Sequence, residues 1–492
     1  MKSKKSIALI LALLMILSAF TLLACDKKGG NGGNGSDIND VETDNETTEY
    51  VKEKYSGLDY NGYKFRIFAI TPGEHYQNFI AEDSTEIWYE EDNADALQHA
   101  VFTRNLLTEE LLNVTITPIW GGSCYTVTDQ TKTLVKAGGD EIDVVHNSHF
   151  KALQVAMEKY YWNLNDLESF DVSEPWWDQE YVDTFTFRKN QLYTICGDYL
   201  TLDDYATPIV YYNKNVVANL NLEDPADLVD AGTWTIDNMM DLASKATFDL
   251  SGDGKMDEND SWGLLDNGNS LVHFIEGCNC PLTALDEEGV PQVTVEKESF
   301  VNTVQYVYER LSLSTSLYEQ PNDDDLIIIK DDRALFYREV LGSLYNFRDM
   351  EGDFSFLPPP KLNEDQENYT SIADGIWCTA LSVPITVTDT NMIGTVLDVL
   401  GGMSTDTVDK ALYEIVLGPK LFREKRTVDM LQYCLAARDY DWAKDIPWAY
   451  PLYGAINEQG VEKTFSFASK LQSNIKVVKV QLKGFTKLLP KY

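Results

Sequence analysis

Strand-like and helix-like spacings of apolar residues alternate along the chain from residue 63 onward. Strands are predicted at 63–70, 114–119 and 142–145, where β-branched and aromatic residues dominate. Helices are predicted between them around 130–136 and at 92–112, where apolar residues recur at Ala96, Ala100, Leu107 and Leu111. The alternation predicts an α/β lobe with a mostly parallel sheet. Such sheets bind ligands beyond the carboxyl ends of their strands, which directs attention to His146 and Asn147.

A second series of elements begins near Tyr205. Its predicted strands are 208–212, 354–357 and 377–383. Its predicted helices are 236–245 with Thr235 as N-cap, 299–313, 332–344, and 409–438 interrupted at Gly418-Pro419. Because more than four hundred residues follow residue 55, the chain is long enough for at least two domains with separate cores.

The N-terminus has the order of a secretory signal peptide over residues 1–24. Three lysines precede an apolar run that ends in Leu22-Leu23-Ala24-Cys25. A small residue before cysteine resembles the lipobox of bacterial lipoproteins, so Cys25 is predicted to carry a lipid on the outer face of the cell membrane. An uncleaved transmembrane anchor is the alternative. Glycines and acidic residues follow, so residues 25–55 are predicted to be a flexible tether.

Charge and cysteine content narrow the function further. The chain has 40 basic and 79 acidic residues, a formal net charge of -39. This surface repels nucleic acid and anionic headgroups, and nucleic acid is therefore excluded as a partner. Six cysteines follow Cys25, but their pairing is not readable from the sequence, and Cys278 and Cys280 are too close together for the usual zinc patterns.

A series of short motifs carries a family likeness. In chain order they are Tyr211-Tyr212-Asn213-Lys214, Leu222-Glu223-Asp224-Pro225, Thr233-Trp234-Thr235, the acidic segment 249–257 and Trp262-Gly263. Pro175-Trp176-Trp177-Asp178, Gly197-Asp198, Phe356-Leu357-Pro358 and Leu412-Tyr413-Glu414 add to them. Together they resemble the extracellular solute-binding proteins, of the family 1 type, that serve carbohydrate ABC importers. Their order and spacing, over most of the chain, make the likeness specific.

The resemblance implies a periplasmic-binding-protein-like fold, in which two α/β lobes joined by crossing hinge strands close on a ligand in the cleft between them. Carried onto this chain, lobe 1 comprises 56–204 plus 382–425, and lobe 2 comprises 205–381 plus 426–492. It also implies a monomeric binding protein that delivers an extracellular carbohydrate, such as an oligosaccharide, to the permease subunits of an importer. No catalysis is implied.

Sugars present apolar ring faces and hydroxyl edges, so aromatic rings, carboxylates and amides are the expected binding groups. The candidates for ligand binding are Asn147, Trp176, Trp177, Asp178, Asp198, Tyr199, Tyr337 and Trp377. For each ring, packing in the core is the alternative. If the Trp176-Trp177 segment is extended, one of its two rings must point outward, because adjacent side chains alternate between faces.

One loop has the pattern of a calcium site. Oxygen-bearing residues at loop positions one, three, five and nine, with Gly254 at position six, reproduce the first part of an EF-hand loop. The predicted Ca²⁺ ligands are Asp249, Ser251, Asp253, Lys255, Asp257, Glu258 and Asp260. The resemblance places such a loop away from the sugar, in a structural role. A polar surface turn is the alternative.

Two other classes of function remain as alternatives, a cell-surface glycan-degrading enzyme and a glycan-binding adhesin. Paired carboxylates suit glycoside hydrolysis, but with 79 acidic residues almost any pair qualifies. The zinc-protease, serine-hydrolase and phosphate-loop patterns are all missing from the sequence. His146 and His149 lack an identifiable third metal ligand, so a hydrogen-bonding or merely exposed role is favoured for them.

Overall fold

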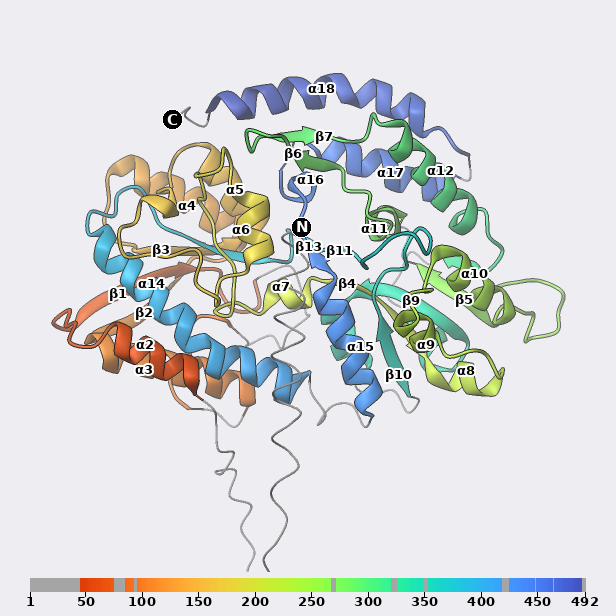
Figure 1. Cartoon of the computed structure of the whole chain (residues 1–492), viewed down its shortest axis with the longest axis horizontal. Helices are drawn as coiled ribbons and strands as arrows, with labels where there is room; N and C mark the ends of the chain where they lie inside the picture. Colours follow the sequence, from red (N-terminus) through yellow and green to blue (C-terminus); the bar gives the residue numbers. More distant parts are fainter. Residues whose placement is uncertain are drawn as a thin grey trace, which may run out of the picture. The chain divides into compact units, whose positions relative to one another are not determined.

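The computed structural model describes residues 45–74, 85–92, 95–266, 271–319, 325–347, 353–417, 424–446, 448–462 and 464–488. They belong to one compact unit, Asn45–Tyr492 (Figure 1). The predicted signal peptide, Cys25 and the first twenty residues of the predicted tether lie outside this described part. Within it, no helix is both long and apolar enough to cross a membrane.

The first sheet has the strand order β12-β3-β1-β2. Its strands are β1 (Tyr63–Ala69), β2 (Val114–Trp120), β3 (Val144–Ser148) and β12 (Thr379–Ser382). β1 runs parallel to both of its neighbours, which confirms the parallel arrangement expected from the alternating pattern. The helices of this lobe are α3 (Ala96–Leu112), α4 (Cys124–Ala137), α5 (His149–Met157), α6 (Gln179–Phe185) and α14 (Thr390–Ser404). β12 pairs antiparallel with β3, so lobe 1 includes residues from 379, three before the predicted boundary.

The second sheet has the order β10-β4-β9-β5-β8. Its strands are β4 (Pro208–Asn213), β5 (Trp262–Asp266), β8 (Leu317–Glu319), β9 (Ala334–Val340) and β10 (Phe354–Leu357). Its helices are α8 (Lys214–Asn219), α9 (Pro225–Asp230), α10 (Ile236–Lys245), α11 (Leu271–Gly277), α12 (Glu298–Leu311), α13 (Asp325–Lys330) and α15 (Lys425–Ala436). The Thr235 hydroxyl accepts a hydrogen bond from Asn238 N, which confirms Thr235 as the N-cap of α10.

The prediction of a helix over 332–344 is wrong, because β9 occupies Ala334–Val340. β9 lies between β4 and β5 and is buried on both faces. A strand covered on both sides has a continuous apolar run without the period of two, so periodicity does not separate it from a helix. The 3₁₀ turns over Leu341–Phe347 lengthen the helical appearance of the sequence.

Three segments of the chain run between the sheets and meet at a junction. α7 (Leu202–Tyr205) connects lobe 1 to β4, and β11 (Ser371–Ile372) pairs in parallel with β13 (Arg438–Asp439). Asp374 N donates to the Ala206 carbonyl at 3.2 Å, which ties the first of these segments to the second. Figure 1 shows α7, β11 and β13 together between the two sheets.

A helix over Glu46–Lys54, α2, lies within the range predicted to be a flexible tether, so that prediction is wrong for these residues. α2 packs against α14 and is held there by polar contacts. Thr48 N donates to Asp406 at 2.7 Å, and Lys54 Nζ lies 3.1 Å from the Asp398 carboxylate. The acidic composition suggested disorder, but these residues form a helix, and their polar contacts with the rest of the chain hold it in place.

Trp176 and Trp177 both pack beneath α14, and each ring is only 1% exposed. The condition under which one of them would point outward is not met, because their segment is a turn and not an extended strand. Both indole Nε1 atoms donate to the same oxygen of the buried Asp398, at 3.1 and 3.3 Å. Gly401 makes room for the rings, since a Cβ there would lie 2.5 Å from Trp176 Cδ1.

Three further helices complete the chain after the junction. They are α16 (Trp442–Asp445), α17 (Tyr450–Glu462) and α18 (Phe467–Leu488), and Figure 1 shows α18 at the outer edge of the ribbon. The β6–β7 hairpin (Thr283–Leu285 with Pro291–Val293) precedes α12. The Phe485 ring of α18 lies 5.6 Å from Trp442 and 5.5 Å from Phe187, so α18 is attached to the core by its inner face.

Candidate functional site

The carboxyl ends of β1, β2 and β3 meet at one edge of the lobe 1 sheet, which is where open α/β sheets bind ligands. Two turns are joined at this edge. Thr71 N donates to the Gly122 carbonyl at 2.9 Å, and Gly122 N donates to the Thr71 hydroxyl at 2.8 Å. The turn between β2 and α4 is thereby fixed at the end of β1.

Aromatic rings are exposed along this edge. Trp120, the last residue of β2, is 38% exposed, and Tyr125, in the first turn of α4, is 51% exposed. The Lys151 ammonium lies 4.3 Å from the centre of the Tyr125 ring and 4.8 Å from that of Phe150. Exposed aromatic faces beside a cation are suited to stacking on a sugar ring and donating to its hydroxyls.

Trp377 is the one predicted binding ring that the structure leaves partly exposed. It lies in the loop between β11 and β12, which is attached to the start of α5. The carbonyls of Cys378 and Gly375 accept from His149 N at 2.8 Å and from Phe150 N at 3.1 Å. Trp377 therefore belongs to a loop at the same sheet edge as Tyr125.

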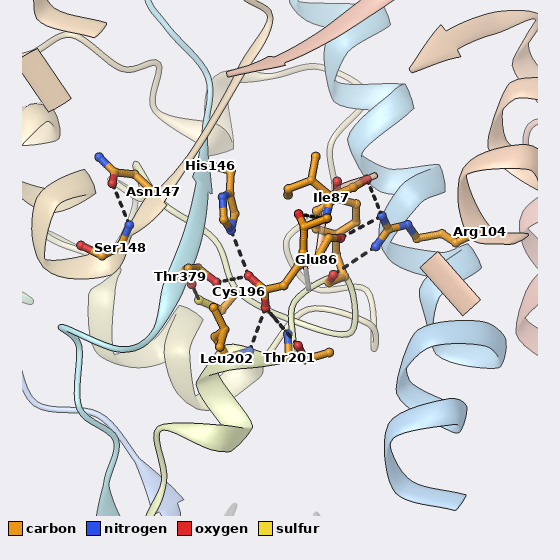
Figure 2. Close-up of polar contacts among 12 residues, drawn as sticks. Glu86, Ile87, Arg104, His146, Asn147, Ser148, Cys196, Thr201, Leu202 and Thr379 are labelled. Carbon is orange, nitrogen blue, oxygen red and sulfur yellow. Dashed lines mark hydrogen bonds and ion pairs between the residues drawn. The ribbon is translucent and has the colours of Figure 1, made fainter. Parts of the chain in front are cut away.

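A buried carboxylate anchors the loops of this edge to each other (Figure 2). Glu86 receives His146 Nε2 at 2.9 Å and the Thr379 hydroxyl at 2.6 Å. Its other oxygen accepts from the amides of Thr201, at 2.5 Å, and Leu202, at 2.8 Å. Burial alone would raise the pKa of Glu86, but these donors outweigh it and lower the pKa to about 2. His146 therefore has the hydrogen-bonding role predicted for it.

Arg104 holds the segment that contains Glu86 and Ile87 in place (Figure 2). Its guanidinium is fully buried and donates to the carbonyls of Glu86 at 3.0 Å, Ile87 at 3.1 Å and Tyr199 at 3.2 Å. The guanidinium also lies 3.9 Å from the centre of the Tyr199 ring. Because Tyr199 is buried under Arg104, this predicted binding ring supports the structure and presents no face to a ligand.

A second polar group occupies the junction, where several carboxylates surround Arg438. Arg438 Nη2 donates to Asp178 at 2.9 Å, and Nη1 pairs with Asp204 and lies 3.7 Å from Asp203. Asp198 accepts from the Thr405 hydroxyl at 2.5 Å. Burial, with the neighbouring carboxylates, raises the pKa of Asp198 to about 7 and also raises that of Asp203. The predicted binding residues Asp178 and Asp198 thus lie at the junction and are both partly exposed.

The lobe 2 side of the junction contains a buried ionic group. Lys444 Nζ lies 3.0 Å from Glu276 and 3.1 Å from His273 Nδ1, on α11. Burial raises the pKa of Glu276 to about 8. Within the described part of the chain, both Glu276 oxygens and Arg338 Nε lack a partner with hydrogen-bond geometry.

The remaining predicted ligand residues are part of the core. Asn147 is buried in β3, where its amide donates to the Thr128 hydroxyl at 2.9 Å and accepts from Ser148 N. Tyr337 is buried in β9 among Tyr211 and Phe347. The sequence reasoning missed Trp120, Tyr125 and Lys151, although the position of Trp120 at the end of a predicted strand was a usable signal.

The loop over Asp249–Asp260 is folded around its own backbone. Asp260 is fully buried and accepts from the amides of Leu250, Ser251 and Asp257 at 2.8–3.0 Å. These amide donors lower the pKa of Asp260. Asp249 accepts from Gly252 N at 2.5 Å and Gly254 N at 2.8 Å. Among the residues that the structure describes, no group of three or more His, Cys, Asp or Glu side chains converges as a metal site.

The other candidates for metal or redox chemistry, His149 and the cysteines, are part of the packed structure. His149 Nδ1 lies 2.9 Å from Asp445 in the core. All six cysteines in the described chain are free thiols. Cys278 and Cys378 are buried, and burial raises the pKa of both thiols. Thiols of this kind behave as small apolar side chains.

The fold is similar to that of several solved sugar-binding proteins. A cyclo/maltodextrin-binding protein complexed with maltotetraose matches with a TM-score of 0.57 at 11% identity, over 85% of this chain and 97% of its own. The maltose-binding periplasmic protein of Listeria monocytogenes, in complex with maltose, matches with a TM-score of 0.55 at 11% identity, over 88% and 100%. An ABC substrate-binding protein from the same organism, in complex with cycloalternan, gives 0.53 at 12%, over 85% and 99%.

At these identities the likeness shows the fold, and it confirms the predicted class of two α/β lobes. In sequence, the chain matches no protein-family model and no curated protein. The function is therefore inferred from the chemistry of the residues at the sheet edge and at the junction.

Proposed function

We propose that this chain is the substrate-binding protein of an ABC importer and captures an extracellular carbohydrate, such as an oligosaccharide, without transforming it. The observation that carries the proposal is a set of aromatic rings at the carboxyl edge of the lobe 1 sheet, of which Trp120 and Tyr125 are exposed and Trp377 is partly exposed. Flat rings, with the Lys151 amine beside Tyr125, have chemistry that suits a pyranose. Structures with the same fold hold maltotetraose, maltose and cycloalternan.

The proposed setting follows from the N-terminal sequence. Cys25 carries the lipid, the chain works as a monomer on the outer face of the cell membrane, and permease subunits receive the sugar. The acidic clusters at the junction orient the two lobes and supply hydroxyl acceptors. In this proposal they perform no hydrolysis.

Removing one exposed ring is expected to weaken sugar binding strongly. A thermal-shift screen of oligosaccharides identifies a ligand, because a bound ligand raises the melting temperature by mass action. With that ligand, Trp377→Ala and Tyr125→Ala should each raise Kd about 30-fold, the loss of about 2 kcal/mol typical of a central anchor. Isothermal titration calorimetry measures both values.

The matched control is Tyr433→Ala, since Tyr433 is an exposed ring on α15 at 39% exposure and belongs to neither sheet edge. It should leave Kd unchanged. Equal affinities in all three variants would contradict the proposed site. Release of shortened products during incubation with the ligand would instead favour the glycan-degrading alternative.

Calcium binding at the Asp249 loop remains a proposal. It requires the carboxylates of Asp249, Asp253 and Asp257 to turn from the backbone amides toward a common centre, while Asp260 keeps its present role as the anchor of the loop. Chelation is then expected to lower the melting temperature and leave sugar affinity unchanged. At free calcium one hundred times Kd the stabilisation is about 2.7 kcal/mol.

Asp253→Ala is expected to abolish the calcium dependence of melting. Differential scanning calorimetry of chelator-treated protein, with and without added calcium, measures it. If added calcium leaves the melting temperature unchanged and its titration produces no heat of binding, the loop is the polar surface turn that its hydrogen bonds already form.

A further inference from the structure

The C-terminal helix α18 has a charge opposite to that of the rest of the chain. Its 22 residues include Lys470, Lys476, Lys479, Lys483 and Lys487 and contain no Asp or Glu. In the whole sequence 79 of 492 residues are acidic, so a segment of this length with average composition would hold three or four of them. The composition of α18 therefore departs from that of the chain and needs a physical reason.

The two faces of α18 are distinct. Its inner face buries Leu471, Ile475, Val478, Leu482 and Phe485. Lys476, Val480, Lys483 and Lys487 follow one another at intervals of three or four residues and are all exposed, so they form a single outer stripe. We call this stripe the basic face. Lys470 and Lys479, beside it, pair with Glu458 and Glu296.

Helix stability does not explain the basic face. Lysines four residues apart, such as Lys483 and Lys487, repel each other and destabilise a helix. Val480 is 72% exposed and Val477 is 53% exposed. A β-branched residue has a low helix propensity, and an exposed one gains no packing energy to offset it. Cations interleaved with protruding valines suit a surface that is anionic outside and apolar just beneath.

We propose that the basic face of α18 docks on the anionic headgroups of a lipid membrane. The ammonium groups pair with lipid phosphates, and Val480, which lies between Lys476 and Lys483 on this face, reaches toward the boundary between headgroups and acyl chains. Because the formal charge of -39 makes the chain as a whole repel such a surface, the protein approaches it with this face. The docking therefore fixes the orientation of the protein on the membrane, whichever ligand it carries and whether or not Cys25 is acylated.

The test uses residues 45–492, which form one compact unit and lack the predicted lipid site. Vesicles of 30% phosphatidylglycerol in phosphatidylcholine are sedimented with the protein at 50 mM and 500 mM salt. We expect binding at low salt only, and none to pure phosphatidylcholine. The triple variant K476E/K483E/K487E should bind about 100-fold more weakly, because each lysine contributes about 1 kcal/mol.

The matched control is K64E/K245E/K425E, three exposed lysines of other elements with the same change in net charge. It should lower binding far less than the triple variant of α18, and both variants should keep the melting temperature of the parent. Equal losses in the two variants would reduce the effect to net charge and overturn the proposal. Absence of parent binding to the anionic vesicles at 50 mM salt would also overturn it, and would favour an acidic protein surface as the partner of α18.

Discussion

Asp398→Ala is expected to destabilise the protein by about 3–5 kcal/mol, the cost of removing one partner from a buried charged network. Asp398 is fully buried and accepts from the indoles of Trp176 and Trp177, from the Tyr55 hydroxyl and from Lys54. Alanine leaves the buried indoles and the Tyr55 hydroxyl without this acceptor, whereas Lys54 is exposed and keeps Glu174 at 2.6 Å. Urea unfolding followed by tryptophan fluorescence measures the loss.

Asp389→Ala is the matched control, because Asp389 is the N-cap of the same helix α14 and accepts from Met392 N. Loss of a cap costs about 1 kcal/mol. If the two substitutions cost the same, the four donors around Asp398 are satisfied in another way. Proteolysis provides a second measurement, since the Asp398 variant should release α2 and expose its backbone to cleavage.

Arg438→Met is expected to destabilise the protein by about 3 kcal/mol or more at pH 7.5, because Asp178 and Asp204 lose the cation that faces them. The loss should shrink at pH 5.5 by about 1 kcal/mol or more. The sign follows from Asp203 and Asp204, because burial raises the pKa of both carboxyls and Arg438 opposes that rise. Without Arg438 the folded protein binds protons on these carboxyls more readily, so the variant regains stability as the pH falls.

Arg426→Met on α15 is the control for this substitution. Arg426 pairs with Asp227 and Asp230 on the surface, so its removal should cost less than about 1 kcal/mol and show little dependence on pH. A loss for Arg438→Met that is equal at pH 5.5 and pH 7.5 would show that the side chain acts by packing alone. Urea unfolding of both variants at the two pH values separates these outcomes.

Local patterns were sufficient to predict many of the elements. β1, β2, β4 and β10 lie within a residue or two of the predicted strands, and α10 begins at the predicted cap. Each of these depends on periodicity or on one capping residue, which are properties of neighbours in sequence. The parallel first sheet followed from the alternation of elements.

The candidate site was much harder to predict, because its contacts join distant residues. Trp176 and Trp177 were read as ligand rings, but a carboxylate more than two hundred residues away holds both indoles inside. Asp398 itself gave a signal, since a single carboxylate within the apolar run 396–400 must be paired. The environment of Arg438 gave none, because its acidic partners come from two separate segments far away in the sequence, at Asp178 and at Asp203-Asp204.

The antiparallel pairing of β12 with β3 has a consequence for the order of folding. Thr379 pairs with Ser148, and Ser382 with Val145, so the edge of the first sheet is completed by a strand made more than two hundred residues later. Until that strand has been made, the backbone amides and carbonyls along that edge of β3 have no strand to pair with. An open edge of this kind invites pairing with other chains. Lobe 1 should therefore mature late and slowly, and depend on holdase chaperones until β12 arrives.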